Sequence, residues 1–183
     1  MDTDKELENI LDKIVKNLIS RKKEEKTMSS QVVVKPLKPL KRVKIVDVKS
    51  PHGVYVYNKK DKLWDLVMVD GEAFKPWKDG YWIIYFDNTR CPACRIYDFS
   101  WYVYVETIGR TMDDTEFVII LCDWFARECK SEAAKKSFEE YDIHASPTTI
   151  LMKVSNGKIE KMERVRGAKN LGELIEIINK FRK

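Results

Sequence analysis

The sequence predicts an α/β fold in which a mixed sheet is flanked by helices and preceded by an N-terminal helix and a β-rich extension. Three observations predict it: a helical stripe near the start, short β-rich segments before residue 70, and alternating strand and helix patterns after Gly80. A chain of 183 residues can bury a sizeable core. We divide it into an amphipathic helix over residues 1–28, a linker and β-rich extension over 29–69, and the main domain over 70–183.

Residues 4–26 repeat apolar side chains at helical spacing, with charged residues on the opposite face. This pattern predicts a helix that packs on its own domain or on a second copy of the chain, so self-association through it is one expectation. Residues 27–30 are expected to form a linker, and 35–39 continue it in extended form because residues before proline avoid the helical conformation. The stripe consists of Leu7, Ile10, Leu11, Ile14, Val15, Leu18 and Ile19.

The β-rich extension has three short segments in which β-branched and aromatic residues dominate, at 43–48, 54–57 and 63–69. Gly53 and the turn-forming residues 58–61 separate them. We expect a meander or hairpin that feeds the main sheet.

The main domain alternates strands and helices. Residues 81–86 are expected to form a strand, and a helix should start at Cys91 and run toward Gly109, a plausible stop signal. Residues 117–121 are nearly all apolar, as expected of a central parallel strand covered on both faces. A helix over 127–141 follows in the prediction.

The C-terminal part of the main domain is predicted to form a hairpin and a helix. Residues 148–154 and 158–165 flank Asn156-Gly157, a dipeptide that favours a two-residue hairpin turn because it accepts positive φ. Asn170 is a suitable cap for the last helix. One face of that helix carries Leu171, Leu174, Ile175, Ile178 and Phe181.

Five short pieces of the main domain occur in an order that is more specific than any one of them. They are Trp82-Ile83-Ile84-Tyr85-Phe86, Cys91-Pro92-Ala93-Cys94, Ser146-Pro147-Thr148, Asn156-Gly157-Lys158 and Arg166-Gly167-Ala168. Over roughly residues 80–183, this order resembles the thioredoxin family.

The resemblance implies a thioredoxin-like fold and a thiol–disulfide oxidoreductase whose redox pair is Cys91 and Cys94. It further implies that Pro147 follows a cis peptide bond beside the pair, and that Ser146 and Pro147 form the substrate-binding edge. The implied partners are protein disulfide substrates and a reductase or other thiol electron donor. The resemblance implies no cofactor.

The chemistry of a Cys-x-x-Cys pair at a helix start is consistent with this role. The attacking species is a thiolate, which the unpaired N–H groups and positive dipole end of a helix stabilise. Arg90 and Arg95 add positive charge on either side of the pair. By position, Cys91 is expected to be the exposed nucleophile, and Cys94, one turn further, to resolve the mixed disulfide.

The sequence departs from the family where a buried carboxylate often stands, six residues before the first cysteine. Tyr85 occupies that position, and Asp87 follows two residues later. Asp87 could take over proton transfer from the resolving thiol, but a solvated carboxylate at the end of a strand is the simpler interpretation.

Cys122 and Cys129 form a second pair. Parallel strands bring their carboxyl ends to the same edge of a sheet, so Cys122 should lie on the same edge as Cys91. A disulfide between Cys122 and Cys129 and the burial of two small apolar thiols are both open. A seven-residue step is poor for zinc, and no metal site is expected.

Two further sets of residues have ordinary interpretations. His52 and His144, the only histidines, are expected in turns, although His144 could approach the site. The aromatic residues of the 91–109 helix are expected to pack in the core and under the N-terminal segment, with a client-binding face as the alternative. They are Tyr97, Phe99, Trp101, Tyr102 and Tyr104.

Two other classes of function stay open. A non-catalytic thioredoxin-like binding module would hold Cys91 and Cys94 as a structural disulfide, and it would bury Cys91, whereas an oxidoreductase should expose it. A Cys-ligated metal protein is the third class.

Composition excludes other classes and indicates a compartment. The net charge of +5, from 34 basic and 29 acidic residues, is dispersed, so nucleic-acid binding is not expected. No apolar run is long enough for a membrane span, and the charged N-terminus lacks a leader core, so we expect a cytoplasmic protein. Abundant Lys, Glu and Ile with a single glutamine, Gln31, suggest a thermophile, whose cytoplasm tolerates disulfides.

Overall fold

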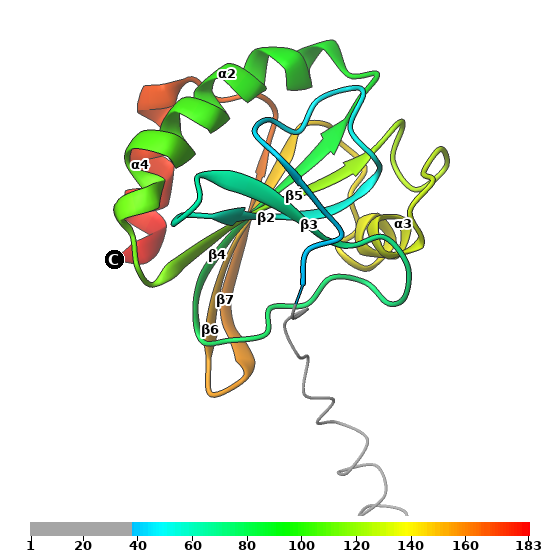
Figure 1. The fold of residues 1–183 in the computed structure, drawn as a ribbon. Coiled ribbons are helices and arrows are strands. Elements are labelled where there is room, and N and C mark those ends of the chain that lie inside the picture. Colours follow the sequence, from blue (N-terminus) through cyan, green and yellow to red (C-terminus); the bar gives the residue numbers. More distant parts are fainter. Residues whose placement is uncertain (1–37) are drawn as a thin grey trace, which may run out of the picture. The chain divides into compact units, whose positions relative to one another are not determined.

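The computed structural model describes residues 38–183, so the expected N-terminal helix and most of the linker lie outside the described residues. The described part forms one seven-stranded sheet with helices on both faces, which confirms the predicted α/β class (Figure 1). The strands are β1 Lys41–Val43, β2 Gly53–Asn58, β3 Leu63–Met68, β4 Gly80–Asn88, β5 Thr115–Cys122, β6 Thr148–Ser155 and β7 Lys158–Arg166. The helices are α2 Pro92–Thr107, the 3-10 turn η1 Gly109–Thr111, α3 Glu132–Glu140 and α4 Leu171–Arg182.

The sheet is mixed, with strand order β1-β3-β2-β5-β4-β6-β7. Only β4 and β5 are parallel neighbours, and all other pairs are antiparallel. The apolar strand β5 lies between β2 and β4, in the interior position that its sequence predicts. The β6–β7 hairpin turns at Asn156 and Gly157, which both have positive φ.

The β-rich extension belongs to the same sheet, because β2 pairs with β5 through a register that sets Tyr55 opposite Ile119. The predicted strand over 43–48 is wrong: β1 ends at Val43 and residues 44–50 form a loop. Asp47 accepts the backbone N–H of Lys49 in a local turn that competes with a strand. Val46 is buried instead, where its N–H and carbonyl both bond the hydroxyl of Tyr102 on α2.

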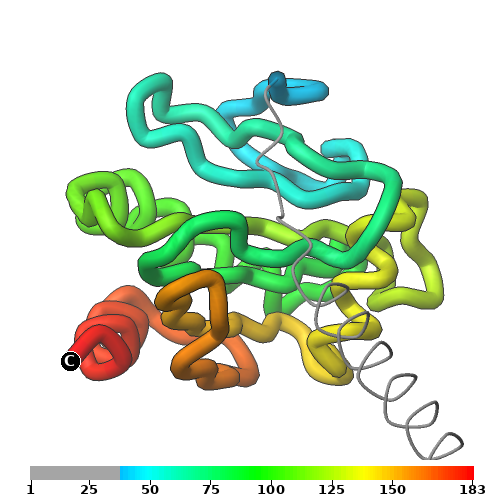
Figure 2. The backbone as a smooth tube through the Cα atoms, turned by 90° about the horizontal axis from the view of Figure 1, so that it is seen from below, coloured from blue at the N-terminus to red at the C-terminus, as the bar shows by residue number. Residues whose placement is uncertain are grey.

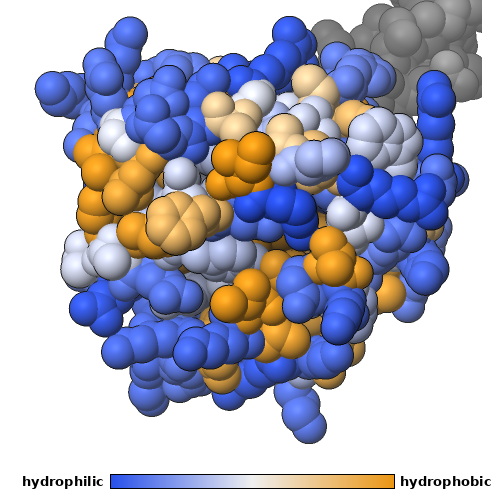
Figure 3. Space-filling model, turned by 90° about the horizontal axis from the view of Figure 1, so that it is seen from above, coloured by the Kyte–Doolittle hydropathy of each residue, from blue (hydrophilic) through white to orange (hydrophobic). Residues whose placement is uncertain are grey.

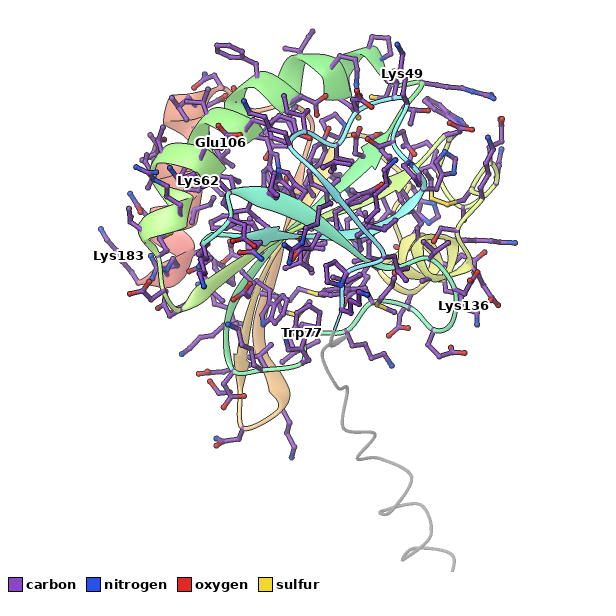
Figure 4. All side chains as sticks on the ribbon, viewed as in Figure 1. Lys49, Lys62, Trp77, Glu106, Lys136 and Lys183 are labelled. Carbon is purple, nitrogen blue, oxygen red and sulfur yellow. A yellow bond between two sulfur atoms is a disulfide. The ribbon has the colours of Figure 1, made fainter. Side chains whose placement is uncertain are left out.

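The helices divide between the two faces of the sheet. Helices α2 and α4 lie on one face and α3 on the other (Figure 2). In Figure 4, Glu106 marks the α2 side and Lys136 the α3 side. Each face has its own apolar core, one under α2 and α4 and one under α3. None of the helices in residues 38–183 is long and apolar enough to span a membrane.

Helix boundaries agree with the sequence at three of four places. Helix α2 starts directly after Cys91, and α4 starts with a capping box between Asn170 and Glu173. Helix α2 ends at Thr107, two residues before Gly109, which is a tight packing position because a Cβ there would lie 2.7 Å from the ring of Phe117. The predicted helix over 127–141 is too long: α3 starts at Glu132, after a loop over 123–131.

Candidate active site

The first two cysteines lie at the N-terminus of α2. Cys91 is the N-cap residue, and its Sγ accepts the backbone N–H of Cys94 at 3.2 Å. Pro92 occupies the first helical turn, where its missing N–H costs nothing. Both cysteines are free thiols. A sulfur at the N-cap faces the unpaired N–H groups of the first turn, the place on a helix that best accommodates an anion.

The expectation that Cys91 is exposed is wrong. Its exposed fraction is 5%, and that of Cys94 is 0%. The Cys91 thiol donates to the carbonyl of Ser146 at 3.5 Å, so the loop that carries Ser146 lies against it. Cys91 is more exposed than Cys94, as predicted, but the difference between the two exposed fractions is small.

The loop before β6 contacts both sulfurs. Besides the contact between Cys91 and the Ser146 carbonyl, the Oγ of Ser146 lies 2.9 Å from the Sγ of Cys94. The peptide bond between Ser146 and Pro147 is cis, as the resemblance implied. Thr148 donates its hydroxyl to Ala145, which closes the loop on itself. The structure thus brings together Cys91, Cys94 and Ser146, three of the residues that the sequence singled out.

Asp87 is not solvated, contrary to the simpler interpretation of the sequence. It is 1% exposed, and the guanidinium of Arg95 contacts both of its carboxylate oxygens, at 2.5 and 2.6 Å. The reason is the alternation along β4: Asp87 points to the same face as Tyr85, which is covered by α2. Arg95, one turn into α2, supplies the opposite charge that makes burial tolerable.

A second carboxylate, Asp98, joins this cluster, and the sequence interpretation missed it. Arg95 reaches Asp98 at 3.3 Å, and the hydroxyl of Tyr85 donates to Asp98 at 3.0 Å and to the Cys94 carbonyl at 3.4 Å. The signal was present: Asp98 follows Arg95 by three residues, a spacing that pairs side chains on a helix. We name the group of Tyr85, Asp87, Arg95 and Asp98 the carboxylate cluster.

Burial and charge shift the proton affinities around the cluster. The pKa of Cys94 is raised well above its ordinary value, first by burial and then by the negative charge of Asp87. Burial, with the charge of Asp87, also raises the pKa of Asp98 to about 7, against the opposing effects of Arg95 and Tyr85. Two carboxylates share one guanidinium, and with a pKa of about 7 Asp98 can both bind and release a proton near neutral pH.

The flanking arginines do not provide free positive charge beside Cys91. The side chain of Arg90 pairs with Glu128, and that of Arg95 with the two aspartates of the cluster. The anion-stabilising groups that remain at Cys91 are therefore the N–H groups of the helix start.

The second cysteine pair is bonded. Cys122, the last residue of β5, forms a disulfide with Cys129 in the 123–131 loop. The backbone N–H of Thr89 donates to the Cys122 carbonyl at 2.9 Å, so the pair lies beside the segment that leads into Cys91. Among residues 38–183, no group of three or more His, Cys, Asp or Glu side chains is placed to hold a metal ion.

His52 is more than a turn residue. It is buried, and it accepts the backbone N–H of Lys130 at 2.8 Å while its other nitrogen lies 3.1 Å from Asp123. It thus ties both ends of the 123–131 loop to the start of β2. His144 is exposed in a turn and pairs with Asp142, as expected of a turn histidine.

Comparisons with known proteins give distant structural likenesses only. No family model matches the chain, and no curated protein does. Thioredoxin from Aeropyrum pernix is 17% identical, with a TM-score of 0.46, over 74% of this chain and 96% of that one. Chloroplastic thioredoxin z is 16% identical, with a TM-score of 0.42, over 57% of this chain and 80% of that one. Fasciola hepatica thioredoxin is 20% identical, with a TM-score of 0.40, over 56% and 82%.

Proposed function

We propose that this protein exchanges a Cys91/Cys94 dithiol for a disulfide in protein substrates. One observation carries the proposal: two free thiols stand three residues apart at a helix N-terminus, and both contact Ser146. Free thiols at this position combine an attacking sulfur, a resolving sulfur one turn away, and a neighbouring backbone carbonyl. Few structural roles require all three.

The exchange has two steps. The Cys91 thiolate attacks one sulfur of the substrate disulfide; that S–S bond breaks, a mixed disulfide forms, and the other substrate sulfur leaves as a thiolate. Cys94, on losing its proton, then attacks the Cys91 sulfur and releases the second substrate thiolate. The substrate gains two electrons and two protons, and the protein ends with a Cys91–Cys94 disulfide. A reductase or another thiol donor would have to reduce it again.

The carboxylate cluster suits the second step. The raised pKa of Cys94 keeps this sulfur protonated while Cys91 attacks, so the two thiols do not compete. The proton must leave Cys94 when the mixed disulfide is resolved. We assign its acceptor to the cluster, in which Asp98 has a pKa near 7 and Tyr85 touches both Asp98 and the Cys94 backbone. This assigns to Asp87 and Asp98 together the role that the family resemblance gives to one carboxylate.

A non-catalytic binding module is the second candidate, and the low exposure of Cys91 favours it. The free state of both thiols argues against it, because a module of that kind would hold them as a structural disulfide. For a substrate disulfide to reach the Cys91 sulfur, the loop that carries Ser146 would have to move aside.

Trapping separates the two candidates. A Cys94→Ser variant should accumulate a mixed disulfide with a model protein that contains a disulfide. The first step can still occur in this variant, but the resolving thiol is gone. A Cys91→Ser variant should accumulate none. In addition, iodoacetamide should alkylate Cys91 of the wild type faster than Cys94. Equal and slow labelling of both thiols, with no trapped species, would leave the binding module as the better description.

A further inference from the structure

An open pocket of about 300 Å³ lies on the α3 side of the sheet, outside the thiol site. Two segments of chain line it, which we call the first wall (the 123–131 loop) and the second wall (residues 143–144), together with α3. The lining residues are Trp124, Phe125, Ala126 and Arg127 of the first wall, Ile143 and His144 of the second wall, and Phe138 and Glu139 of α3. Ligand pockets for small molecules start at about this size, so the pocket fits one large side chain rather than a whole cofactor.

The first wall is fixed to the segment that carries Cys91. The Oδ1 of Asn88 accepts the backbone N–H of Phe125 at 2.7 Å, and the carbonyl of the same Asn88 accepts the N–H of Cys91 at 3.0 Å. Phe125 has a φ of 52°, a conformation that a bulky residue adopts only when its surroundings impose it. The Cys122–Cys129 disulfide and the contacts of His52 close the loop around it.

The second wall continues into the loop that contacts both sulfurs. His144 precedes Ser146 by two residues, and two residues of chain span at most about 7 Å. Arg164 of β7 donates to the Tyr141 carbonyl and pairs with Asp142, which anchors the start of this wall. Both walls are therefore connected to the thiol site, one through the hydrogen bonds of Asn88 and the other through the chain to Ser146.

The lining is aromatic and partly open to solvent. Trp124 is 38% exposed, and its ring meets that of Phe125 edge to face at 5.1 Å. Phe125 meets Phe138 in the same manner at 6.1 Å. Aromatic edges and faces at these distances offer an apolar side chain several favourable contacts.

We propose that this pocket binds an aromatic or large aliphatic side chain of the client polypeptide, two residues away from the client cysteine. The inference rests on the proposed exchange function. In an extended client that lies along 144–146, side chains two residues apart point to the same side and stand about 7 Å apart. His144 lines the pocket and Ser146 contacts both sulfurs, so the pocket and the thiols are joined by no more than this length of chain. The pocket thus selects clients by a neighbouring apolar residue.

The test uses the full-length protein and short peptides whose single cysteine carries a small mixed disulfide. Two peptides have Phe two positions before or after the cysteine, and a third has Ser at both places. The wild type should reduce the better-placed Phe peptide about tenfold faster in kcat/KM than the Ser peptide, as expected for burial of one aromatic side chain. Trp124→Ser, which opens the pocket, and Ala126→Leu, which fills it, should bring this ratio close to one.

Phe99→Ser is the matched control. Phe99 is 78% exposed on α2, on the opposite face of the sheet, so its loss removes a surface ring without touching the pocket. Figure 3 shows the surface at the α2 end of the molecule, where apolar side chains lie among charged ones. The control should keep the tenfold ratio, and a small aromatic disulfide should react equally with all variants.

The outcomes separate the pocket from the chemistry. A wild-type ratio near one for both Phe peptides, or a tenfold ratio that survives in both pocket variants, overturns the pocket while leaving the exchange intact. Failure to reduce any disulfide overturns the proposed function instead. A binding titration with peptides that carry Ser in place of Cys then decides the pocket alone, because it needs no exchange: a preference for Phe that is lost in Trp124→Ser supports it, and equal binding of both peptides contradicts it.

Discussion

The two cysteine pairs lie at the same edge of one sheet and differ in everything that surrounds their sulfurs. Cys91 and Cys94 are free, three residues apart, with a helix start before them and the carboxylate cluster behind them. Cys122 and Cys129 are bonded, seven residues apart, in an irregular loop that His52 holds at both ends. Position at the sheet edge is therefore common to both pairs, and the pairs differ in whether groups that can stabilise a thiolate and accept its proton lie nearby. The proposed exchange assigns the chemistry to the pair that has such groups.

The largest difference between the pairs should appear on mutation of the sulfurs. Cys91→Ser should reduce exchange to the uncatalysed background. Replacing Cys122 and Cys129 together by Ser should leave exchange with a small aromatic disulfide within about twofold, while lowering the free energy of unfolding by about 2.5 kcal/mol, as expected for opening a loop of this length. Thiol-release rates and urea denaturation measure the two effects. Loss of exchange in the double variant would mean that the second pair takes part in the chemistry.

The second largest effect should come from the buried ion pair beside Cys94. Asp87→Asn should lower the free energy of unfolding by roughly 2–3 kcal/mol, because it leaves the guanidinium of Arg95 partly buried with one weak partner. Asp114→Asn is the matched control, since Asp114 pairs with Arg182 at the surface and such pairs contribute well below about 1 kcal/mol. Equal losses in the two variants would show that burial of Asp87 has no energetic consequence.

The carboxylate cluster should also make stability depend on pH, which the bonded pair cannot do. The pKa of Asp98 in the folded protein, about 7, lies above its ordinary value of 3.8. The folded state therefore binds a proton that the unfolded state releases between about pH 4 and 7, so this group's contribution is present at low pH and is lost as the pH rises to 7. Allowing for coupling to Asp87, we expect a decline on the order of 1–2 kcal/mol.

Urea denaturation at pH 4.5 and 7.5 measures this decline. Asp98→Asn should remove it, leaving the pH dependence of the remaining groups. The carboxylates with lowered pKa values, such as Asp123, act in the opposite sense but only at acidic pH, near and below their ordinary values. An unchanged difference between the two pH values in Asp98→Asn would refute the assignment.

The smallest effect concerns the reduction potential. Arg90 and Arg95 are neutralised by acidic partners, so the potential of the Cys91/Cys94 couple should lie between the thioredoxin and disulfide-isomerase values, about −270 to −180 mV. Ala93→His adds a donor beside the Cys91 anion and should raise the potential by about 20 mV, roughly 1 kcal/mol. Equilibration with glutathione measures both. A value near −120 mV would mean that the helix start dominates far more than this balance allows.

The parts of this fold that were predictable from the sequence are those with local signals. Asn156-Gly157 predicts its hairpin, Asn170 predicts the start of α4, and the apolar run of β5 predicts an interior strand. The pieces that failed depend on distant residues. Residues 44–50 have the composition of a strand, but Tyr102 draws Val46 into the core.

The candidate site likewise has features with a local sequence signal and features that depend on distant residues. The position of Cys91 at a helix start is local and was predicted. The burial of Asp87 depends on Arg95 from a different element. The loop that precedes the shortened α3 is held by a disulfide and by His52, which lies 78 residues before its partner Lys130. The Cys91 thiol, which is 5% exposed, contacts the carbonyl of Ser146, 55 residues later in the chain. Such contacts leave no periodic pattern in the sequence, so pattern analysis cannot find them.

The charges of β7 have a consequence for aggregation. This strand forms one border of the sheet, with one side of its backbone unpaired by any strand of the described region. Its sequence has charges of both signs and no two adjacent apolar residues: Lys158-Ile159-Glu160-Lys161-Met162-Glu163-Arg164-Val165-Arg166. The opposite border, β1, has only three residues, two of them basic. Short or charged borders resist pairing with the backbone of another chain. These two borders therefore disfavour the addition of an extra strand from another polypeptide, including a protein substrate of the proposed exchange.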